Sequence, residues 1–305
     1  MMLLKALAVI GVAVLMLSAL LALLPAAKSF AGRWPSGAQR FVSYVGLISI
    51  ALAMAFPLWV TLVNSISTPA QIMSRPPTLF PTSISLDGFR QALDAGMLGY
   101  IGNSVIQTIL IVIGQVFTAV CAGYAFAFLR FPLKRTLFVL FLSTMMIPFE
   151  VTVVTNLTTI RDLGLYNTYA GLAVPFMATG FGAFMMRQAF LGVPDELRDA
   201  ARLDGMGDLK FLRAVALPLV RPSAAAMAVF AFLSGWTQYL WPFLATNADG
   251  IKTVQVGVKT IRNAQIDKLS GTFAALVLAA LPLVVGLIVF QKQLIKGLTA
   301  GAVKG

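Results

Sequence analysis

Seven apolar segments dominate the chain, and each is long enough to cross a lipid bilayer as a helix. They cover about residues 6–24, 41–64, 103–128, 136–157, 168–190, 216–244 and 272–291. A helix of roughly 20 residues spans the hydrocarbon core. Because no water is available there, each segment must pair its own backbone polar groups, and a helix does this. The sequence therefore predicts an all-α integral membrane protein.

The charge content supports this class. Charged residues make up 11% of the chain, whereas a typical soluble domain has about 25%. The formal net charge of +12 would also suit a nucleic-acid binder, but the lysines and arginines lie in short loops between apolar segments. This distribution is typical of the positive-inside rule, so no nucleic-acid partner is expected.

Several kinds of chemistry are disfavoured by the residues that the chain lacks. It has no histidine and a single cysteine, Cys121. It also lacks the G-x-x-x-x-G-K-[ST] loop that cradles nucleotide phosphates. We therefore expect no catalytic residue, no metal site and no nucleotide hydrolysis in this chain. An intramembrane enzyme would need histidine or paired carboxylates within the segments.

The orientation in the membrane follows from lysine and arginine. Placing residues 195–208 in the cytoplasm puts fifteen of these residues on that side and eight outside. This asymmetry predicts an outer N-terminus and a cytoplasmic C-terminus. The first segment could instead be a signal peptide, since Ala26-Ala27 follows Pro25. We favour a retained helix, because cleavage would invert every later loop.

Two outer regions are expected between the segments. Residues 65–102 include the run Pro76-Pro77-Thr78-Leu79-Phe80-Pro81, which cannot form a regular helix. After it, Ser85-Leu86-Asp87 predicts the start of a short helix at the membrane surface. Residues 245–271 form the other outer loop and carry four of the outer positive charges.

A charged block interrupts the apolar pattern at residues 195–208, which hold five of the eleven carboxylates. Pro194 is suited to a helix start, and the two carboxylates after it complement the helix dipole. Gly205 marks a turn, and a second short helix is expected over about 208–216. Two short helices at the membrane surface could insert into a cleft on a soluble partner. On charge pattern alone, an ordinary solvated loop is the alternative.

The block resembles the EAA loop of permease subunits of binding-protein-dependent ABC importers. The resemblance rests on Asp199-Ala200-Ala201, Gly205 and Leu217-Pro218, with Asp199 where the family has Glu. It implies coupling helices that dock on a cytoplasmic ATPase. The residues expected to take part are Glu196, Asp199, Ala200, Ala201, Asp204, Gly205, Leu217 and Pro218.

The resemblance extends over about residues 41–305 and implies a six-helix ABC importer permease core. Further matching motifs are Arg130-Phe131-Pro132-Leu133-Lys134-Arg135, Met146-Ile147-Pro148, Gly235-Trp236-Thr237-Gln238-Tyr239-Leu240-Trp241-Pro242 and the ending from Gly297 to Gly305. They favour the carbohydrate-uptake branch and its maltose-type second permease. The permease domain is then 41–305, with a cytoplasmic coupling loop at 191–221. Residues 1–40 are expected to form one extra N-terminal transmembrane helix and a cytoplasmic linker.

The resemblance also implies the rest of a transport system. A homologous permease subunit would form the other half of the path, and a cytoplasmic ATPase dimer would bind ATP and Mg. An extracytoplasmic substrate-binding protein would deliver a small-molecule solute. This chain would hold no cofactor and would be a multi-pass subunit of a bacterial inner membrane. An ion-driven secondary transporter is the alternative, and charges on several intramembrane helices would indicate it.

Glu150 is the one carboxylate well inside an apolar segment. A charge at that depth costs about 2.5–3.5 kcal/mol on insertion scales, so Glu150 should face water or the bundle interior. It could line the path of the solute or be a buried, hydrogen-bonded structural carboxylate. The motifs around Glu150 and Trp236 look most like those of glycerol-3-phosphate permeases. They imply glycerol-3-phosphate, a glycerophosphodiester or a related sugar as the solute.

The expected substrate path contains Glu150, Asn103, Trp236, Gln238 and Tyr239. For Asn103 the alternative is packing between helices, because small polar residues often join membrane helices. For the aromatic group, which includes Trp241, the alternative is a belt at the outer membrane interface.

Overall fold

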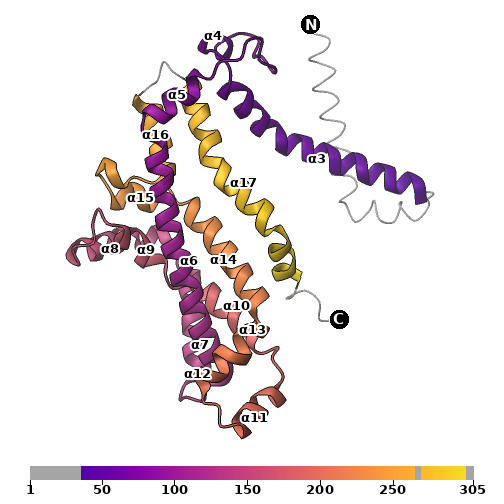
Figure 1. Cartoon of the computed structure of the whole chain (residues 1–305), viewed down its shortest axis with the longest axis vertical. Coiled ribbons are helices and arrows are strands. Elements are labelled where there is room, and N and C mark those ends of the chain that lie inside the picture. Colours follow the sequence, from indigo (N-terminus) through magenta and orange to yellow (C-terminus); the bar gives the residue numbers. More distant parts are fainter. Residues whose placement is uncertain (1–35, 265–268, 300–305) are drawn as a thin grey trace.

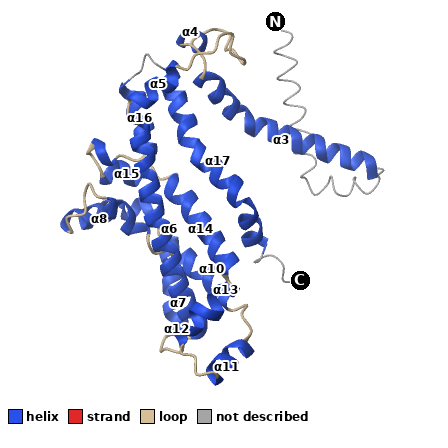
Figure 2. Ribbon diagram, in the orientation of Figure 1, coloured by secondary structure: helices blue, strands red, loops and turns tan. Residues whose placement is uncertain are grey.

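The computed structural model describes residues 36–264 and 269–299, and within these ranges the chain is helical with no strand (Figures 1 and 2). The predicted segment 6–24 lies outside the described residues. The elements are α3 (Ser36–Ser65), α4 (Pro69–Ile72), α5 (Asp87–Asp94), α6 (Met97–Phe128), α7 (Lys134–Ser143), η1 (Thr144–Met146), α8 (Phe149–Asp162), α9 (Tyr169–Ala173), η2 (Val174–Phe176), α10 (Gly180–Phe190), α11 (Asp195–Leu203), α12 (Asp208–Phe211), η3 (Leu212–Ala216), α13 (Leu217–Leu219), α14 (Arg221–Trp236), α15 (Leu240–Ala245), η4 (Asp249–Ile251), α16 (Val254–Ala264) and α17 (Leu269–Thr299).

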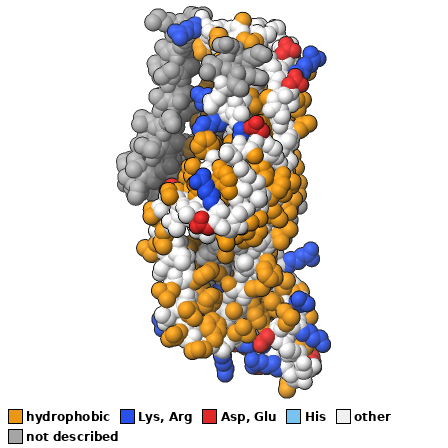
Figure 3. Space-filling view, turned by 90° about the vertical axis from the view of Figure 1, so that its left-hand side faces the viewer, with side chains coloured by type: hydrophobic (Ala, Val, Ile, Leu, Met, Phe, Trp, Pro, Cys, Tyr) orange, Lys and Arg blue, Asp and Glu red, His pale blue; other side chains and the backbone are white. Residues whose placement is uncertain are grey.

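Among the described residues, three uninterrupted helices are long and apolar enough to cross a membrane, namely α3, α6 and α17. They contain the predicted segments 41–64, 103–128 and 272–291, which confirms helices at these places. On the face in Figure 3, hydrophobic side chains cover a broad area in the lower middle of the molecule, and several Lys and Arg lie at the end that carries α11. This distribution fits a protein whose middle lies in lipid.

The other three described segments are bent. The first bend, of 98°, separates residues 134–146 (α7 and η1) from α8. The second, of 53°, separates residues 169–176 (α9 and η2) from α10, and the third, of 80°, separates residues 208–219 from α14. If each bent pair is one span, the described residues make up to six crossings. Prolines in or near these segments are the sequence feature that marks such bends. Pro148, Pro175 and Pro218 lie at or beside the bends, and proline cannot donate the backbone hydrogen bond that continues a helix.

Helix α6 is central to the described bundle, since it packs along α10 and α14 and also contacts α9 and α16. Its side chains stabilise the break between η2 and α10. Gln115 Nε2 donates to the Phe176 carbonyl at 2.7 Å, and Thr118 Oγ1 donates to the Met177 carbonyl at 2.6 Å. Broken membrane helices need such partners for their freed backbone groups. The bend between η2 and α10 is therefore held by α6.

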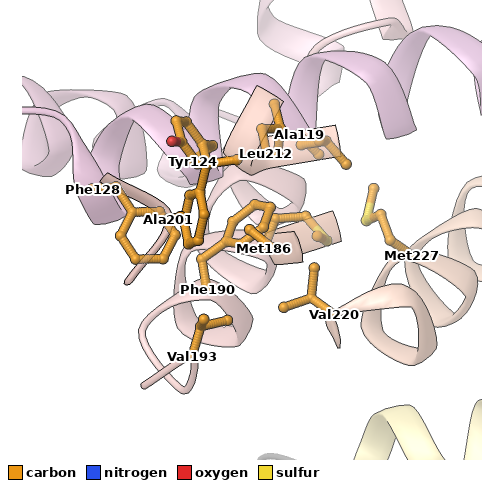
Figure 4. Close-up of a cluster of buried hydrophobic side chains, with 13 residues drawn as sticks. Ala119, Tyr124, Phe128, Met186, Phe190, Val193, Ala201, Leu212, Val220 and Met227 are labelled. Atoms are coloured by element: carbon orange, nitrogen blue, oxygen red, sulfur yellow. The ribbon is translucent and has the colours of Figure 1, made fainter. Parts of the chain in front are cut away.

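A cluster of aromatic rings joins α6, α10 and α12 near the loop end (Figure 4). Tyr124, Phe128, Phe190 and Phe211 are all buried, and their paired ring centroids lie 5.1–6.5 Å apart. Rings at these separations in tilted or edge-to-face pairs add to the stabilisation that burial alone gives. The cluster fixes the charged loop to the membrane helices.

Trp236 and Trp241 are buried and do not form part of an interfacial belt. Trp236 and Trp241 are each 1% exposed. The Trp236 indole N–H donates to the Ala279 carbonyl at 3.0 Å, and that of Trp241 donates to the Gly171 carbonyl at 3.1 Å. A buried indole needs such a partner. The alternative of an aromatic belt is therefore wrong for these two residues, which hold α14 to α17 and α15 to α9.

The two predicted outer loops are folded. The short helix expected after Ser85 is α5, which starts at Asp87. The region 245–271 contains α16, which packs on α6 and α17 and buries Val254 and Ile261. Figure 1 places α4, α5 and α16 at one end of the molecule and α11 at the other. The end opposite α11, which the sequence predicts to face outward, is thus a packed layer of short helices.

Helix α3 diverges from the bundle and meets α17 near the outer end (Figure 1). Many of its large apolar side chains are exposed, among them Phe41, Leu52 and Met54. Lipid or another subunit would cover these side chains in a membrane.

Gly123 is predicted to be essential for the contact between α6 and α10. A Cβ atom there would lie 2.6 Å from Met186 Cβ and 2.8 Å from the backbone nitrogen of Arg187. We expect Gly123→Ala to lower stability by about 1–3 kcal/mol through overpacking, measured as thermal unfolding of the purified protein in detergent. Gly102→Ala, in the same helix with no atom within 4 Å of its Cβ, is the control and should unfold like the parent. Equal melting of the Gly123→Ala variant and the parent would contradict this packing account.

Candidate functional site

The charged block forms a helix that stands apart from the membrane helices. α11 begins directly after Pro194 with Asp195 and Glu196 in its first turn, and it has Arg202 in its last turn. Both charge signs complement the helix dipole. The predicted helix over this region is therefore confirmed, and Figure 1 shows it at the far end of the molecule.

Glycine is required at the end of α11. Gly205 has a φ of +71°, a conformation that other residues adopt at a cost. The Met206 N–H donates to the Ala201 carbonyl at 2.8 Å, and the Gly205 N–H donates to the Arg202 carbonyl at 3.0 Å. This pair of bonds is the Schellman motif, which often carries a hydrophobic contact across the turn. Here Ala201, 5% exposed, and Met206 belong to one apolar cluster.

The second short helix was also predicted correctly. α12 begins at Asp208 and continues through the π-helical turn η3 into α13. Phe211 is 2% exposed and Leu212 is 9% exposed, with Val215 packed against the same cluster. The π turn ends just before Leu217-Pro218, where proline removes a backbone donor. Leu217 and Pro218 therefore mark the corner from which the chain turns into α14.

The remaining predicted loop residues are on the surface. Glu196, Asp199, Ala200, Asp204 and Pro218 are exposed, and Leu217 is half-buried. Their exposed side chains are available to another protein.

An exposed leucine in this loop was not predicted. Leu203 is 90% exposed at the end of α11, and the nearby Leu197 and Leu209 are 40% and 59% exposed. A partner that covered these side chains would remove apolar surface from water, which favours binding. The signal in the sequence was a leucine between charged residues in a segment outside the membrane.

A polar network ties the loop to the end of α6. Arg198 Nη2 donates to the Phe128 carbonyl at 2.8 Å and lies 3.8 Å from Asp208 Oδ1. The guanidinium carbon of Arg198 is 5.2 Å from the centre of the Phe128 ring. Tyr124 Oη is 3.1 Å from both the carbonyl and the Oδ1 oxygens of Asp208. These four residues were not predicted as a site. The feature of the sequence that could have indicated it is Tyr124, a hydroxyl-bearing residue near the end of an apolar helix.

Asn103 lies toward the end opposite α11, and both its amide nitrogen and its amide oxygen are hydrogen-bonded. Its Nδ2 donates to the carbonyls of Gly250 and Lys252 at 3.1 and 2.9 Å, and its Oδ1 accepts the Tyr169 hydroxyl at 2.6 Å. Asn103 is 8% exposed. This geometry supports the packing alternative for Asn103, because the side chain holds residues 250–252 to α6 and α9.

Gln238 and Tyr239 lie together with polar and cationic neighbours. Gln107 Nε2 donates to Gln238 Oε1 at 2.8 Å. The Tyr239 ring stacks on Phe243 with a centroid distance of 5.5 Å. Lys259 Nζ donates to the Tyr239 hydroxyl and lies 4.2 Å from the centre of the Phe243 ring. The Trp236 side chain does not join this group, because it is buried against α17.

Glu150, expected well inside an apolar segment, lies where that segment bends. It is exposed in the first turn of α8, directly after the bend at Pro148. A carboxylate in a first helical turn is stabilised by the helix dipole. The neighbouring Phe149 packs on Phe176 and Trp241 with centroid distances of 5.1 and 5.8 Å. The start of α8 is thereby held against the segment that carries Trp241.

The chain is similar to known membrane transport components. The family model described as "Binding-protein-dependent transport system inner membrane component" matches residues 119–300. The sn-glycerol-3-phosphate transport system permease proteins UgpE of Brucella abortus (strain 2308) and Rhizobium meliloti (strain 1021) are each 33% identical to the chain over 270 residues. That is 85% of this chain, and for the Brucella protein 96% of the relative.

One solved structure shares the fold. The crystal structure of a bacterial ABC transporter involved in the import of the acidic polysaccharide alginate contains a chain that matches with a TM-score of 0.76 and 23% identity. The match covers 85% of this chain and 98% of that chain. At this identity the likeness concerns the fold.

The turn at Gly205 provides a direct test of the loop. In Gly205→Val a β-branched residue must adopt positive φ, which costs about 1–3 kcal/mol, so the angle between α11 and α12 should change. We expect the variant to insert normally but to lose association with its ATPase and solute uptake, measured by co-purification and transport. Gly207→Val is the matched control, because Gly207 has a φ of −74° and an extended backbone. Normal uptake and stimulated ATP hydrolysis in Gly205→Val would refute the coupling role.

Proposed function

The chain belongs to the inner membrane components of binding-protein-dependent transport systems, and we propose that its solute is glycerol-3-phosphate, a glycerophosphodiester or a related sugar. It is a permease subunit of an ABC importer and not an enzyme. In such a system a separate ATPase, a partner permease and a substrate-binding protein work with it. The alternative of an ion-driven secondary transporter is set aside on this membership.

The solute proposal rests on the relatives. Those named for sn-glycerol-3-phosphate transport match 85% of this chain at 33% identity. Lys259 supports it, because its ammonium group beside Tyr239 could form a charge-assisted hydrogen bond to a phosphate. The Gln107–Gln238 pair offers amide groups that can bond to hydroxyls. We propose that Gln238 and Tyr239 face the solute path, with Lys259 attracting its negative charge.

Glu150 has a different role in this proposal. A bare carboxylate would repel a phosphate, so Glu150 would bind hydroxyl groups or a cationic head group such as choline. Its exposure at the start of α8 makes it available to a solute or to the partner permease. The carboxylate would then contribute to selectivity and not to phosphate binding.

The coupling mechanism that we propose begins at the loop 191–221. Closure of an ATPase dimer on ATP would displace α11, and the Arg198–Asp208–Tyr124 contacts would pass the displacement to α6. The aromatic cluster would carry the same displacement to α10. The bends at Pro148 and at residues 177–179 are places where the helices could change angle between inward and outward openings.

The membrane arrangement completes the proposal. The protein crosses the membrane several times, and we propose a cytoplasmic loop at 191–221, an outer N-terminus and a cytoplasmic C-terminus. We propose that residues 41–305 are the permease domain and that residues 1–40 add a retained helix and a linker. The outer layer formed by α4, α5 and α16 would then meet the substrate-binding protein.

Lys259→Gln tests the nature of the solute. In the reconstituted complex with its binding protein, glycerol-3-phosphate should stimulate ATP hydrolysis and enter the vesicles. Loss of a hydrogen bond to a charged group costs about 1.5–3 kcal/mol, so Lys259→Gln should raise the KM for the phosphorylated solute about tenfold or more, and Lys259→Arg should restore it. Arg262→Gln removes the same charge from the same helix and should have little effect. If the parent complex is not stimulated by any glycerol phosphate, the solute proposal is wrong.

Glu150→Gln tests the carboxylate separately. The substitution keeps the shape of the side chain and removes its charge. We expect unchanged assembly and basal ATP hydrolysis, with altered selectivity between glycerol-3-phosphate and its choline diester in competition uptake. A variant that transports every tested solute like the parent would show that Glu150 is structural.

A further inference from the structure

A basic cavity lies between α6, α7 and α10, close to the loop end of α6. It has a volume of about 320 Å³ and is lined by Phe126, Lys134, Arg135, Phe138 and Arg187. Three of its five lining residues are cations, and none is a carboxylate. The cavity shares no lining residue with Glu150, Tyr239 and Lys259, to which the solute path was assigned. It adjoins the coupling network, because Lys134 binds the carbonyls on either side of the Phe128 carbonyl that Arg198 binds.

Two of the cations are held in place by the backbone of α6 and the segment after it. Arg187 Nε donates to the Phe126 carbonyl at 3.1 Å, and its guanidinium carbon lies 4.4 Å from the centre of the Phe138 ring. Lys134 Nζ donates to the carbonyls of Ala127 and Leu129 at 3.0 and 2.9 Å. The end of a helix presents carbonyls that favour cations. Their positions are therefore fixed before any ligand arrives.

The three cations lack a counter-ion within the described residues. The four ion pairs found there involve Arg90, Arg198, Arg202 and Lys252 as cations, and none involves Lys134, Arg135 or Arg187. Like charges held close together repel. An anion in the cavity would offset this repulsion. The fixed cations thus form an electrostatically prepared anion site.

The surroundings of the cavity indicate which anion. Along α7, Leu137, Val139 and Leu140 are 45%, 55% and 59% exposed, so an apolar surface continues from the cavity along the helix. Two walls of the cavity are phenylalanine rings. A phospholipid offers the matching combination of a charged phosphate and apolar chains. Basic pockets between membrane helices on the cytoplasmic side are suited to anionic lipid head groups.

We propose that this cavity binds the phosphate of an anionic phospholipid from the cytoplasmic leaflet. The leaflet rests on the proposed orientation, in which the loop 191–221 is cytoplasmic. The phosphate is held by Arg135 and Arg187, with Lys134 contributing its remaining N–H. One acyl chain lies along the exposed leucines of α7. The bound lipid connects the ends of α6, α7 and α10 and stabilises the part of α6 to which the coupling loop is attached.

Native mass spectrometry of the complete permease–ATPase complex tests the proposal. Phosphatidylglycerol is titrated into delipidated complex, and binding is compared between the parent and Arg135→Gln or Arg187→Gln. Each variant should bind phosphatidylglycerol about tenfold more weakly, as expected for the loss of a hydrogen bond to a charged group. Arg130→Gln is the matched control, because Arg130 is an exposed arginine of the same connection and does not line the cavity. Thermal unfolding establishes that each variant is folded.

Arg135→Gln is expected to fold like the parent, since Arg135 is exposed and has no ion pair within the described part of the chain. A loss of binding in this variant would therefore report on the cavity and not on folding. Equal phosphatidylglycerol binding by the parent and Arg135→Gln would overturn the proposal. So would equal binding of phosphatidylcholine and phosphatidylglycerol, or binding of inorganic phosphate without phosphatidylglycerol. Cross-linking of Arg135→Cys to the ATPase would assign the cavity to a subunit interface. These measurements use no solute, so their failure is distinct from failure of the solute proposal.

Discussion

The close approach of α6 and α10 is the contact on which most of the described structure depends. It is possible because Gly123 presents no side chain where Met186 and the Arg187 backbone lie. This approach brings Arg187 to the carbonyl of Phe126 and Phe190 to the ring of Tyr124. The basic cavity and the attachment of the charged loop to α6 both depend on that contact. In a membrane, where lipid is as apolar as the helices, such close backbone packing is a main source of association.

The loop and the solute region are constructed in different ways. The loop is attached by a helix-ending turn, a ring cluster and a network centred on Asp208, all of which involve residues close to the end of α6. The outer region is attached by single side chains that reach across helices, as Asn103 and Trp236 do. The first arrangement supports docking of another protein on exposed residues such as Leu203. The second gives the outer end a fixed surface on which a binding protein could rest.

The sequence was sufficient for features that depend on local chemistry. Pro194 and the carboxylates after it predicted α11, and Gly205 predicted a turn that needs positive φ. The positions of α3, α6 and α17 followed from uninterrupted apolar runs. These predictions succeed because the interactions that determine them lie within a few residues of one another. The coupling residues and the solute path remain proposals about function.

The failures have a common physical cause. Pro148 indicates a kink, but a window of apolar residues does not give the angle of 98°, since both halves are apolar. Likewise, Trp236 could have been interfacial or buried, and its partner Ala279 is 43 residues away in the chain. Asn103 similarly bonds to residues 250–252, which no local pattern connects to it. Long-range pairing of this kind is settled by packing and not by composition.

The attachment between Asp208 and α6 has a mechanical consequence. Packed rings such as Phe211 against Phe128 resist compression but separate easily under tension, because dispersion forces fall off steeply with distance. The hydrogen bonds of Tyr124 to Asp208 and of Arg198 to Phe128 add directional contacts that oppose separation. A loop joined by both can push on α6 during one half of a cycle and pull on it during the other. In the proposed coupling mechanism, this joint would transmit displacement of the loop to α6 in both directions.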